Sequence, residues 1–367
     1  MDADVIVIGA GIVGAACAHA LANAGLQVLV LDARMGGATG AGMGHLVVMD
    51  DNPAELALSR HSIAQWRALV PHMSDDCAYS ACGTLWIAAN AEEMAEAERK
   101  QQRLREHGIA SRLLDAVALS RAEPALRRGL AGALKVPGDG ILYAPNAARW
   151  LLAQGGASVR VEHAKVESIA HDGVLALADG SRRAAPQVVL ANGIQATALC
   201  PELPIRPKKG HLLITDRYPG TVHHQLVELG YVTSAHHSEG DSVAFNVQPR
   251  PTGQLLVGSS RQFDTTDAAV EAPMLARMLR RTLDYLPGLA NLNAVRSWTG
   301  MRAATPDGLP LLGKHPWREK LWLAVGHEGL GVTTAPGSAH LLAALMTGAT
   351  PEFDAAPYAT RGLLETA

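Results

Sequence analysis

Apolar and polar positions along the chain switch between the repeats typical of strands and of helices, and the first switch lies within residues 4–33. The segment DVIVIGAGIVGAACAHALANAGLQVLVLDA holds an apolar run, a glycine-rich turn, a stretch of small residues and a second apolar run. This order predicts a strand, a helix and a second strand. A connection through a helix places the two strands parallel, so the chain begins with a βαβ unit of a parallel sheet.

Beyond this unit the pattern turns helical, then alternating, then mixed. Helical spacing predicts helices over 52–70 and 272–287, and residues 91–108 predict a solvated surface helix because they combine many charges with few large apolar residues. Residues 158–193 alternate Val, Leu and Ile with turn signals at HDG and ADG, which indicates strands. Residues 320–348 return to a strand, a glycine-rich turn and a helix.

This order of elements predicts an α/β fold with two domains. The βαβ unit, the apolar strand that ends in LANG at Gly193 and the carboxy-terminal strand and helix together suit one parallel sheet. We therefore predict a Rossmann-like nucleotide-binding domain with an inserted mixed α+β substrate domain. The first domain is expected to take residues 1–80, 141–200 and 300–367, and the second to take residues 81–140 and 201–299.

The turn after the first strand has the spacing Gly9-x-Gly11-x-x-Gly14. Gly9 permits a tight turn, Gly11 lets a pyrophosphate approach the backbone, and Gly14 allows the helix to pack closely on the strand. Asp32 ends the second strand, where a carboxylate can accept a hydrogen bond from a ribose hydroxyl. Dinucleotide binding is the prediction, with a purely structural glycine turn as the alternative, and the acid argues against the 2′-phosphate of NADP.

A second glycine-rich turn favours FAD over NAD. An NAD domain would continue as repeated βαβ units, whereas here the second strand leads into the loop GGATGAGMGHL and out of that pattern. Near the other end, GHEGLGVTT places Gly326, Gly329 and Gly331 ahead of a helix. The amino terminus of this helix can face the pyrimidine end of an isoalloxazine, which gains negative charge on reduction.

Composition narrows the class of partner. The chain has 32 basic and 35 acidic residues, and no segment joins clustered basic residues to stacking aromatics, so nucleic acid is not an expected partner. The first residues lack the basic region and cleavage site of a signal peptide, and no apolar run approaches the ~18–20 residues that span a bilayer. We expect a cytoplasmic protein without a transmembrane segment. The four cysteines form no CxxC pair and lack a histidine at zinc-like spacing, so no metal is predicted.

Four segments resemble the D-amino-acid oxidase superfamily of flavoproteins, in the branch of glycine and sarcosine oxidases. They are the amino-terminal βαβ unit, LSRAEPAL at 119–126, WTGMRAATPDGLPLLG at 298–313, and LAVGHEGLGVTTAPGSAHLLAALMTG at 323–348. With KVESI and VVLANG they extend over nearly the whole chain. The resemblance implies an FAD-binding domain of the glutathione-reductase type. It also implies amine oxidation by hydride transfer from the substrate α carbon to flavin N5.

The resemblance assigns Arg302, in GMRAATPDG, to the substrate carboxylate. A guanidinium binds a carboxylate through two parallel hydrogen bonds and so fixes the Cα–H for transfer. The alternative is a structural ion pair. His45, in the small-residue loop TGAGMGHL, is expected to bond the flavin or a substrate hydroxyl, or only to cap the loop.

The predicted site divides into three groups. Arg302 and His45 are the candidate catalytic residues, and Arg302, Phe245, Asn246 and His327 are the candidate substrate-binding residues. Relatives with covalent flavin attach it at positions that correspond to Gly300 and Ala41, so non-covalent FAD is expected. The predicted cofactor-binding residues are Gly9, Gly11, Ile12, Val13, Gly14, Asp32, Ala33, Arg34, Thr39, Gly42, Met43, Gly44, His45, Leu46, Val166, Ala191, Gly193, Gly326, Glu328, Gly329, Leu330, Gly331, Val332 and Thr333.

Within the superfamily, GMGHLVVMDDNPAELALS resembles the catalytic subunit of bacterial D-hydroxyproline dehydrogenases. This resemblance implies dehydrogenation of cis-4-hydroxy-D-proline or D-proline, with electrons passed to redox partner subunits. One alternative is a glycine or sarcosine oxidase that releases hydrogen peroxide, or the glycine-oxidising subunit of hydrogen cyanide synthase. A flavin-bearing subunit that only transfers electrons or supports assembly is an alternative of another class.

Overall fold

The computed structural model describes residues 3–230, 240–263 and 265–361, and it contains the predicted βαβ unit. The unit consists of β1 (Val5–Ile8), α1 (Ile12–Asn23) and β2 (Val28–Asp32), with β1 and β2 paired in parallel. Both strands are apolar throughout their buried lengths, as strands covered on both faces must be.

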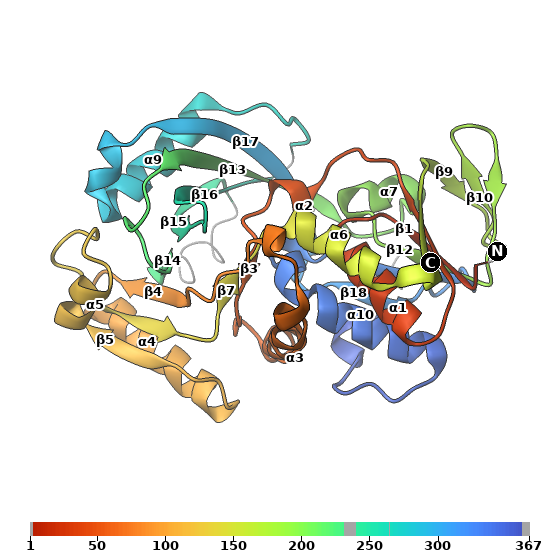
Figure 1. Ribbon diagram of the computed structural model, residues 1–367, viewed down its shortest axis with the longest axis horizontal. Coiled ribbons are helices and arrows are strands. Elements are labelled where there is room, and N and C mark those ends of the chain that lie inside the picture. The colour runs from red at the N-terminus through yellow and green to blue at the C-terminus, as the bar shows by residue number, and fades with distance from the viewer. Residues whose placement is uncertain (1–2, 231–239, 264, 362–367) are drawn as a thin grey trace.

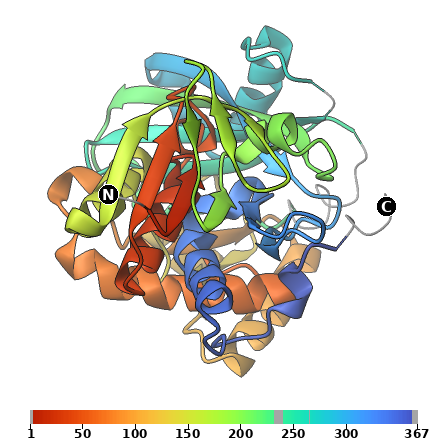
Figure 2. The same ribbon diagram turned by 90° about the vertical axis from the view of Figure 1, so that its right-hand side faces the viewer.

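A six-stranded sheet grows around this unit in the order β18-β19-β12-β1-β2-β8. All neighbours are parallel except β18, which runs antiparallel to β19. The remaining strands are β8 (Val159–His163), β12 (Gln187–Leu190), β18 (Leu311–Lys314) and β19 (Leu321–Val325). Strands from the two ends of the chain therefore share one sheet, and Figure 2 shows the red amino-terminal elements beside the blue carboxy-terminal ones.

Helices cover one face of this sheet and a small sheet covers the other. The helix α1 packs against α10 (Gly331–Thr347) and α6 (Ala144–Gln154), and α10 also packs on α3 (Pro53–Leu69). A second core lies on the opposite face. It includes residues of β9 (Val166–Ile169), β10 (Leu175–Leu177) and α7 (Ala196–Leu199), while β11 (Arg182–Arg183) pairs with β10.

The second large sheet has eight strands in the order β17-β13-β16-β15-β14-β4-β6-β5. It is antiparallel except where β14 runs parallel to β4. Its strands are β4 (Thr84–Ala88), β5 (Arg112–Asp115), β6 (Gly132–Val136), β13 (Arg206–Arg217), β14 (Gln225–Glu228), β15 (Ser242–Pro249), β16 (Gln254–Phe263) and β17 (Ala294–Ala304). Three helices pack against strands of this sheet: α4 (Ala91–Glu106), α5 (Ala116–Ala122) and α9 (Ala272–Tyr285).

Short elements join the two large sheets. In Figure 1 the sheets lie side by side along the long axis, with α2 (Ala38–Ala41), α3 and β3 (His45–Leu46) between them. The strand β3 pairs with β7 (Gly140–Ile141). The 3₁₀ helices are η1 (Val70–His72), η2 (Asp75–Cys77), η3 (Gly156–Ser158), η4 (Gly193–Gln195), η5 (Pro287–Asn291), η6 (Glu328–Leu330) and η7 (Ala356–Tyr358).

The observed elements match the predicted α/β class with a Rossmann-type sheet and an additional mixed domain. The strands of the six-stranded sheet fall within 1–80, 141–200 and 300–367, while β17 of the other sheet crosses the predicted boundary at residue 300. In the described part of the chain no helix is both long enough and apolar enough to cross a bilayer.

Candidate active site

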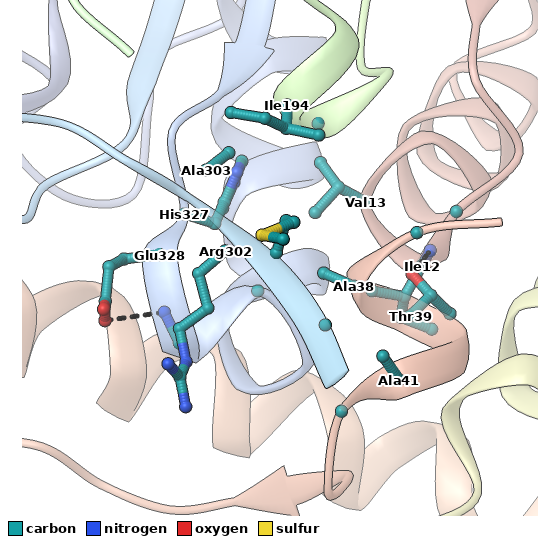
Figure 3. Close-up of a pocket in the computed structure, with 18 of the residues that line it drawn as sticks. Ile12, Val13, Ala38, Thr39, Ala41, Ile194, Arg302, Ala303, His327 and Glu328 are labelled. Carbon is teal, nitrogen blue, oxygen red and sulfur yellow. Dashed lines mark hydrogen bonds between the residues drawn. The ribbon is translucent and has the colours of Figure 1, made fainter. Parts of the chain in front are cut away.

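A cavity of about 1720 Å³ extends from the glycine turn of the parallel sheet to the face of the eight-stranded sheet. Its walls include the loop from Ala33 to His45, the start of α3, strands β13 and β17, and the turn from Gly326 to Val332. Figure 3 shows Arg302 and Glu328 together on one side of this cavity, and Ile12, Thr39 and Ala41 on the opposite side.

The first glycine turn fits the approach of a pyrophosphate. Gly9 has a φ of +106°, and a Cβ there would lie 2.8 Å from the Ala191 carbonyl oxygen. A Cβ on Gly14 would lie 2.0 Å from the Gly9 carbonyl oxygen, so only glycine lets α1 pack this closely on the turn. Gly11, the residue just before α1, has no side chain to cap the helix, so the helix amino terminus can face a phosphate.

The Asp32 carboxylate is held at the end of β2 by two backbone groups. Its Oδ2 accepts from the Ala10 N–H at 2.6 Å, and its Oδ1 accepts from the Arg34 N–H at 2.7 Å. Thr39 ties the next loop to α1, because its Oγ1 accepts from the Ile12 N–H at 2.9 Å. These contacts orient an acceptor at the cavity wall, where the ribose of a dinucleotide is expected, so the residues present fit FAD.

Three of the predicted cofactor-binding residues do not border the cavity, while the other twenty-one do. Gly14 lies behind the turn that it allows to form. Leu46 is 2% exposed and belongs to the main apolar core. Thr333 is buried, and its Oγ1 donates to the His45 carbonyl oxygen at 2.9 Å. Gly14, Leu46 and Thr333 therefore lie behind the cavity wall, and their contact with a cofactor stays a prediction.

Arg302 lies on β17 with its guanidinium across the neighbouring strand β13. A Cβ on Gly210 would lie 2.7 Å from Arg302 Nη2, so this glycine makes the space that the guanidinium fills. Arg302 Nη1 donates to the Ser260 carbonyl oxygen at 3.1 Å. The strand pairing fixes the base of the side chain, since Arg302 is opposite Lys208.

Glu328 is the negatively charged residue next to a cluster of cations formed by Arg302, Lys208 and Arg261. It has a φ of +46° in the turn before α10, and its Oε1 lies 2.9 Å from Lys208 Nζ. Burial alone would raise the pKa of Glu328, but Arg302, Lys208 and Arg261 together lower that pKa to about 2. Glu328 is therefore ionised at neutral pH, and the cluster keeps a positive balance that suits an anionic ligand.

His45 belongs to a polar group on the same cavity. Its Nδ1 is in hydrogen-bond contact with Gln225 Oε1, and its Nε2 faces Asn246 Nδ2 at 3.1 Å. Burial lowers the pKa of His45 to about 4, and the charges of Arg250 and Arg302 act in the same direction, against the Gln225 hydrogen bond. The imidazole is thus neutral. Asn246 Oδ1 is buried without a hydrogen-bond partner in the described residues.

The other two predicted substrate-binding residues have different surroundings. His327 borders the cavity, but its Nε2 contacts Ser338 Oγ at 3.1 Å, and burial lowers its pKa to about 4. The side chain of Phe245 is fully buried and stacks on Tyr285, with ring centroids 4.4 Å apart. Phe245 borders the cavity, but this stacking directs its ring toward α9, so its role in substrate binding stays a prediction.

Several cavity residues were not predicted. Lys208 and Gly210 reach the site through strand pairing, which the sequence motifs do not show. Glu55 and Trp86 also border the cavity, from α3 and β4. The sequence signal for Glu55 was its position three residues after Asn52 at a helix start.

The two positions of covalent attachment in relatives carry no reactive side chain here. Gly300 and Ala41 face each other across β17 and α2, and a Cβ on Gly300 would lie 2.5 Å from the Ala41 Cβ. Their small size brings α2 close to β17 at the cavity wall. Non-covalent binding of FAD stays a prediction.

Two groups of side chains elsewhere have the types and spacing of metal ligands. They are His61, His340 and Glu352, and Cys200, Glu202 and His315. In the second group Glu202 Oε1 already pairs with Arg318 Nη2 at 3.0 Å and with His315 Nε2 at 3.1 Å. Both groups lie outside the cavity lining.

Comparison with known proteins places the chain in a family. The model of the DAO family, described as FAD dependent oxidoreductase, matches residues 4–345. Glycine oxidase from Geobacillus kaustophilus is 30% identical over 97% of this chain and 96% of its own length. D-amino acid dehydrogenase from Xanthobacter autotrophicus is 30% identical over 78% of this chain and 68% of its own length.

Solved structures agree with the sequence comparison. The crystal structure of glycine oxidase from Geobacillus kaustophilus has a TM-score of 0.86 and 27% identity, covering 98% of each chain. L-proline dehydrogenase from P. horikoshii has a TM-score of 0.88 and 21% identity, covering 100% of this chain and 98% of its own, which shows a shared fold. With the family model spanning nearly the whole chain, the protein belongs to the DAO family and is an FAD-dependent oxidoreductase.

Proposed function

We propose that this enzyme oxidises a small D-amino acid or cyclic secondary amine, preferably cis-4-hydroxy-D-proline or D-proline, and passes the electrons to a redox partner subunit. The observation that carries the proposal is Arg302, whose guanidinium borders the same cavity as the dinucleotide turn. The relatives named glycine oxidase and D-amino acid dehydrogenase support an amino acid as substrate.

In the proposed reaction, the residues of the chain bind and orient the substrate. Arg302 holds the carboxylate by two parallel hydrogen bonds, while Ser260 and Gly210 keep the guanidinium flat on the sheet. Bound FAD supplies the acceptor for the hydride that leaves the substrate α carbon. Glu328 remains ionised and limits the positive charge that the free site must carry.

The polar group around His45 supports a substrate that carries a hydroxyl group. Asn246 Oδ1 is an acceptor without a protein donor in the described chain, and the neutral His45 imidazole fixes the amide of Asn246. A buried acceptor is costly unless a ligand supplies the donor. The Phe245 ring is held in a stack on Tyr285, and the polar wall formed by Asn246 suits a small ring such as hydroxyproline better than an aromatic side chain.

A glycine or sarcosine oxidase is the second candidate function. The observation that favours it is the coverage of the whole chain by relatives of that name, including 29% identity to glycine oxidase from Pseudomonas putida over 99% of this chain. The oxidase differs from the dehydrogenase in its electron acceptor, which would be dioxygen.

An anaerobic titration tests both functions. Purified flavoprotein is mixed with cis-4-hydroxy-D-proline, D-proline, sarcosine and glycine, and flavin bleaching is followed before air is admitted. Bleaching by the cyclic D-amino acids with slow return of colour in air is the expected result. Bleaching by glycine or sarcosine with prompt return and hydrogen peroxide release would contradict it, and a flavin that no amino acid reduces would indicate a non-catalytic subunit.

A further inference from the structure

Two helices of this protein begin with the same sequence pattern, Asn-x-x-Glu. At the start of α4, Asn90 Oδ1 accepts from the Glu93 N–H at 2.9 Å, and Glu93 Oε2 accepts from the Ala89 N–H at 2.7 Å. The side chains at the two ends of the pattern thus each satisfy a backbone donor at the helix start, in the manner of a capping box. This is the expected structural use of a glutamate at the third helical position.

At the start of α3, the second glutamate is used differently. Asn52 Oδ1 accepts from the Glu55 N–H at 2.8 Å, as in α4. Glu55 Oε1, in contrast, is buried and has no hydrogen-bond partner in the described residues. Glu55 borders the cavity that also contains Arg302. The fold therefore keeps a carboxyl oxygen unpaired at the wall of the active site, where a ligand can supply the missing donor.

Among the described residues, the cation that acts on Glu55 is already bound to another acid. The charged groups that act on it are Asp51, Lys100, Glu328 and Asp50. Lys100 is already bound to Asp50 and lies over the Trp86 ring, 4.4 Å from its centroid. Burial is the main cause that raises the pKa of Glu55 to about 8, and the three acids add to it while Lys100 opposes it. Without a ligand Glu55 is mostly protonated at neutral pH.

We propose that Glu55 receives the positively charged nitrogen of the substrate and accepts a proton from it before the α carbon is oxidised. The inference rests on the proposed function, since it takes an amino acid as substrate. Arg302 binds the anionic end of a zwitterion. Glu55 is an acidic group on the same cavity, and one of its oxygens has no hydrogen-bond partner among the described residues, whereas Glu328 already lies beside Lys208.

The proton transfer is balanced within the complex. The zwitterion binds with Glu55 as a carboxylate, so a protonated Glu55 first releases its proton to water. One N–H bond of the substrate ammonium then breaks, an O–H bond forms on Glu55, and the electron pair stays on nitrogen. The products are a neutral amine and a neutral carboxyl group. The nitrogen lone pair is then available to stabilise the electron-poor α carbon as its hydride leaves.

The pH dependence of flavin reduction tests this role of Glu55. For the wild type, kcat/KM with D-proline should rise with pH up to about 8 and fall above the pKa of the substrate amine. Glu55→Gln keeps the size but cannot accept the proton, so its acid limb should move to the pKa of the amine, ~10 for an alkylammonium. At pH 7 the variant should be slower by ~100-fold. Glu98→Gln, on the exposed face of α4, is the matched control and should behave like the wild type.

A calorimetric measurement provides a readout without turnover. The probes are 2-aminoisobutyrate, which has an ammonium but no α hydrogen, and pivalate, which has a methyl group in place of the ammonium. In buffers of different ionisation enthalpy at pH 7, 2-aminoisobutyrate should release nearly one proton on binding to the wild type and none on binding to Glu55→Gln. Pivalate should release none from either protein.

The two failures are distinguishable. If no amino acid bleaches the wild-type flavin, the proposed function fails. If the wild type is reduced but Glu55→Gln retains the acid limb near pH 8, or binds 2-aminoisobutyrate with the same proton release, the role of Glu55 is overturned while the proposed function stands. A higher KM with an unchanged pH profile would likewise assign Glu55 to structure alone.

Discussion

The guanidinium of Arg302 is held in position before a substrate binds. It lies over Gly210, donates to the Ser260 carbonyl and is balanced by Glu328 before any ligand arrives. Arg302→Lys keeps the charge but removes the planar fork, so kcat/KM for D-proline should fall ~100-fold, and Arg302→Ala should lower it ~1000-fold. Steady-state kinetics at low substrate concentration measure both values. D-prolinamide lacks the carboxylate, so the two substitutions should change kcat/KM for this compound only slightly. An equal fall in kcat/KM for D-proline and for D-prolinamide would contradict carboxylate binding by Arg302.

Gly210 offers a separate test of the same geometry. A methyl group there would meet both terminal nitrogens of Arg302, at 2.7 and 2.8 Å, so Gly210→Ala should displace the guanidinium. We expect ~10-fold weaker substrate binding with little change in melting temperature, because the clash falls on the end of a flexible side chain. Gly288→Ala is the control, since a Cβ at Gly288 meets nothing within 4 Å. Equal KM values for the two variants would refute the proposed packing.

At this scale the sequence predicts residues whose role lies in a local motif. Asp32 follows from its distance along the chain to the glycine turn, and the presence of Arg302 in the cavity follows from a family resemblance. The stacking of Phe245 on Tyr285 could not be predicted, because the neighbours of a strand residue depend on the register of the sheet, and no motif fixes that register. Gly210 could not be predicted because its contact with Arg302 depends on the pairing of distant strands, and Glu55 could not because no motif shows that it borders the cavity.

The same distinction holds for whole elements. The βαβ unit and the carboxy-terminal strand, turn and helix could be predicted because their hydrophobic patterns and glycines are local. The order of the eight-stranded sheet could not, since β17 pairs with β13 and β14 pairs with β4 across long stretches of chain. Those pairings depend on packing between distant segments, and a local hydrophobic pattern does not show which distant segments pack together.

The close packing of α1 on its glycine turn predicts that a larger residue at position 14 weakens flavin binding. The Cβ of Gly14→Ala would lie 2.0 Å from a backbone oxygen, and backbone cannot move aside as a side chain end can. The helix should shift away from β1, and the turn should then bind the pyrophosphate of FAD less tightly. We expect purified Gly14→Ala to contain less than about a tenth of the wild-type flavin per chain, measured by the ratio of visible to ultraviolet absorbance. Gly288→Ala should keep a full complement, and full flavin in both variants would contradict this account of the turn.

For the whole molecule, Asp139 links stability to pH. It is 1% exposed, and its Oδ1 accepts from the Val48 N–H at 3.2 Å, which connects the segment after β3 to the turn before β7. Burial raises the pKa of Asp139 from 3.8 to about 7, against the hydrogen bonds from Thr84 and Val48. The folded protein thus keeps a proton that the unfolded chain gives up above pH ~4.

The sign of the effect follows from this difference. The contribution of Asp139 to the free energy of unfolding should fall by ~2–4 kcal/mol as pH rises from about 4 to 7, and then level off. Asp139→Asn removes the titration, so the stability difference between wild type and variant should shrink or reverse over that range. Urea unfolding at pH 5 and pH 8 measures it, with the exposed Asp75→Asn as control. A constant difference between wild type and Asp139→Asn at the two pH values would contradict the prediction.

The strand order of the parallel sheet has a consequence for biosynthesis. The strand β1 leaves the ribosome well before β12, yet it lies between β2 and β12, and β12 must wait for β19 at residues 321–325. The face of α1 that packs against α10 also stays exposed until α10 has been synthesised. Synthesis proceeds at ~5–20 residues per second, so the nascent chain exposes an unfinished sheet for many seconds. Flavin capture is therefore expected to follow the synthesis of β19 and α10.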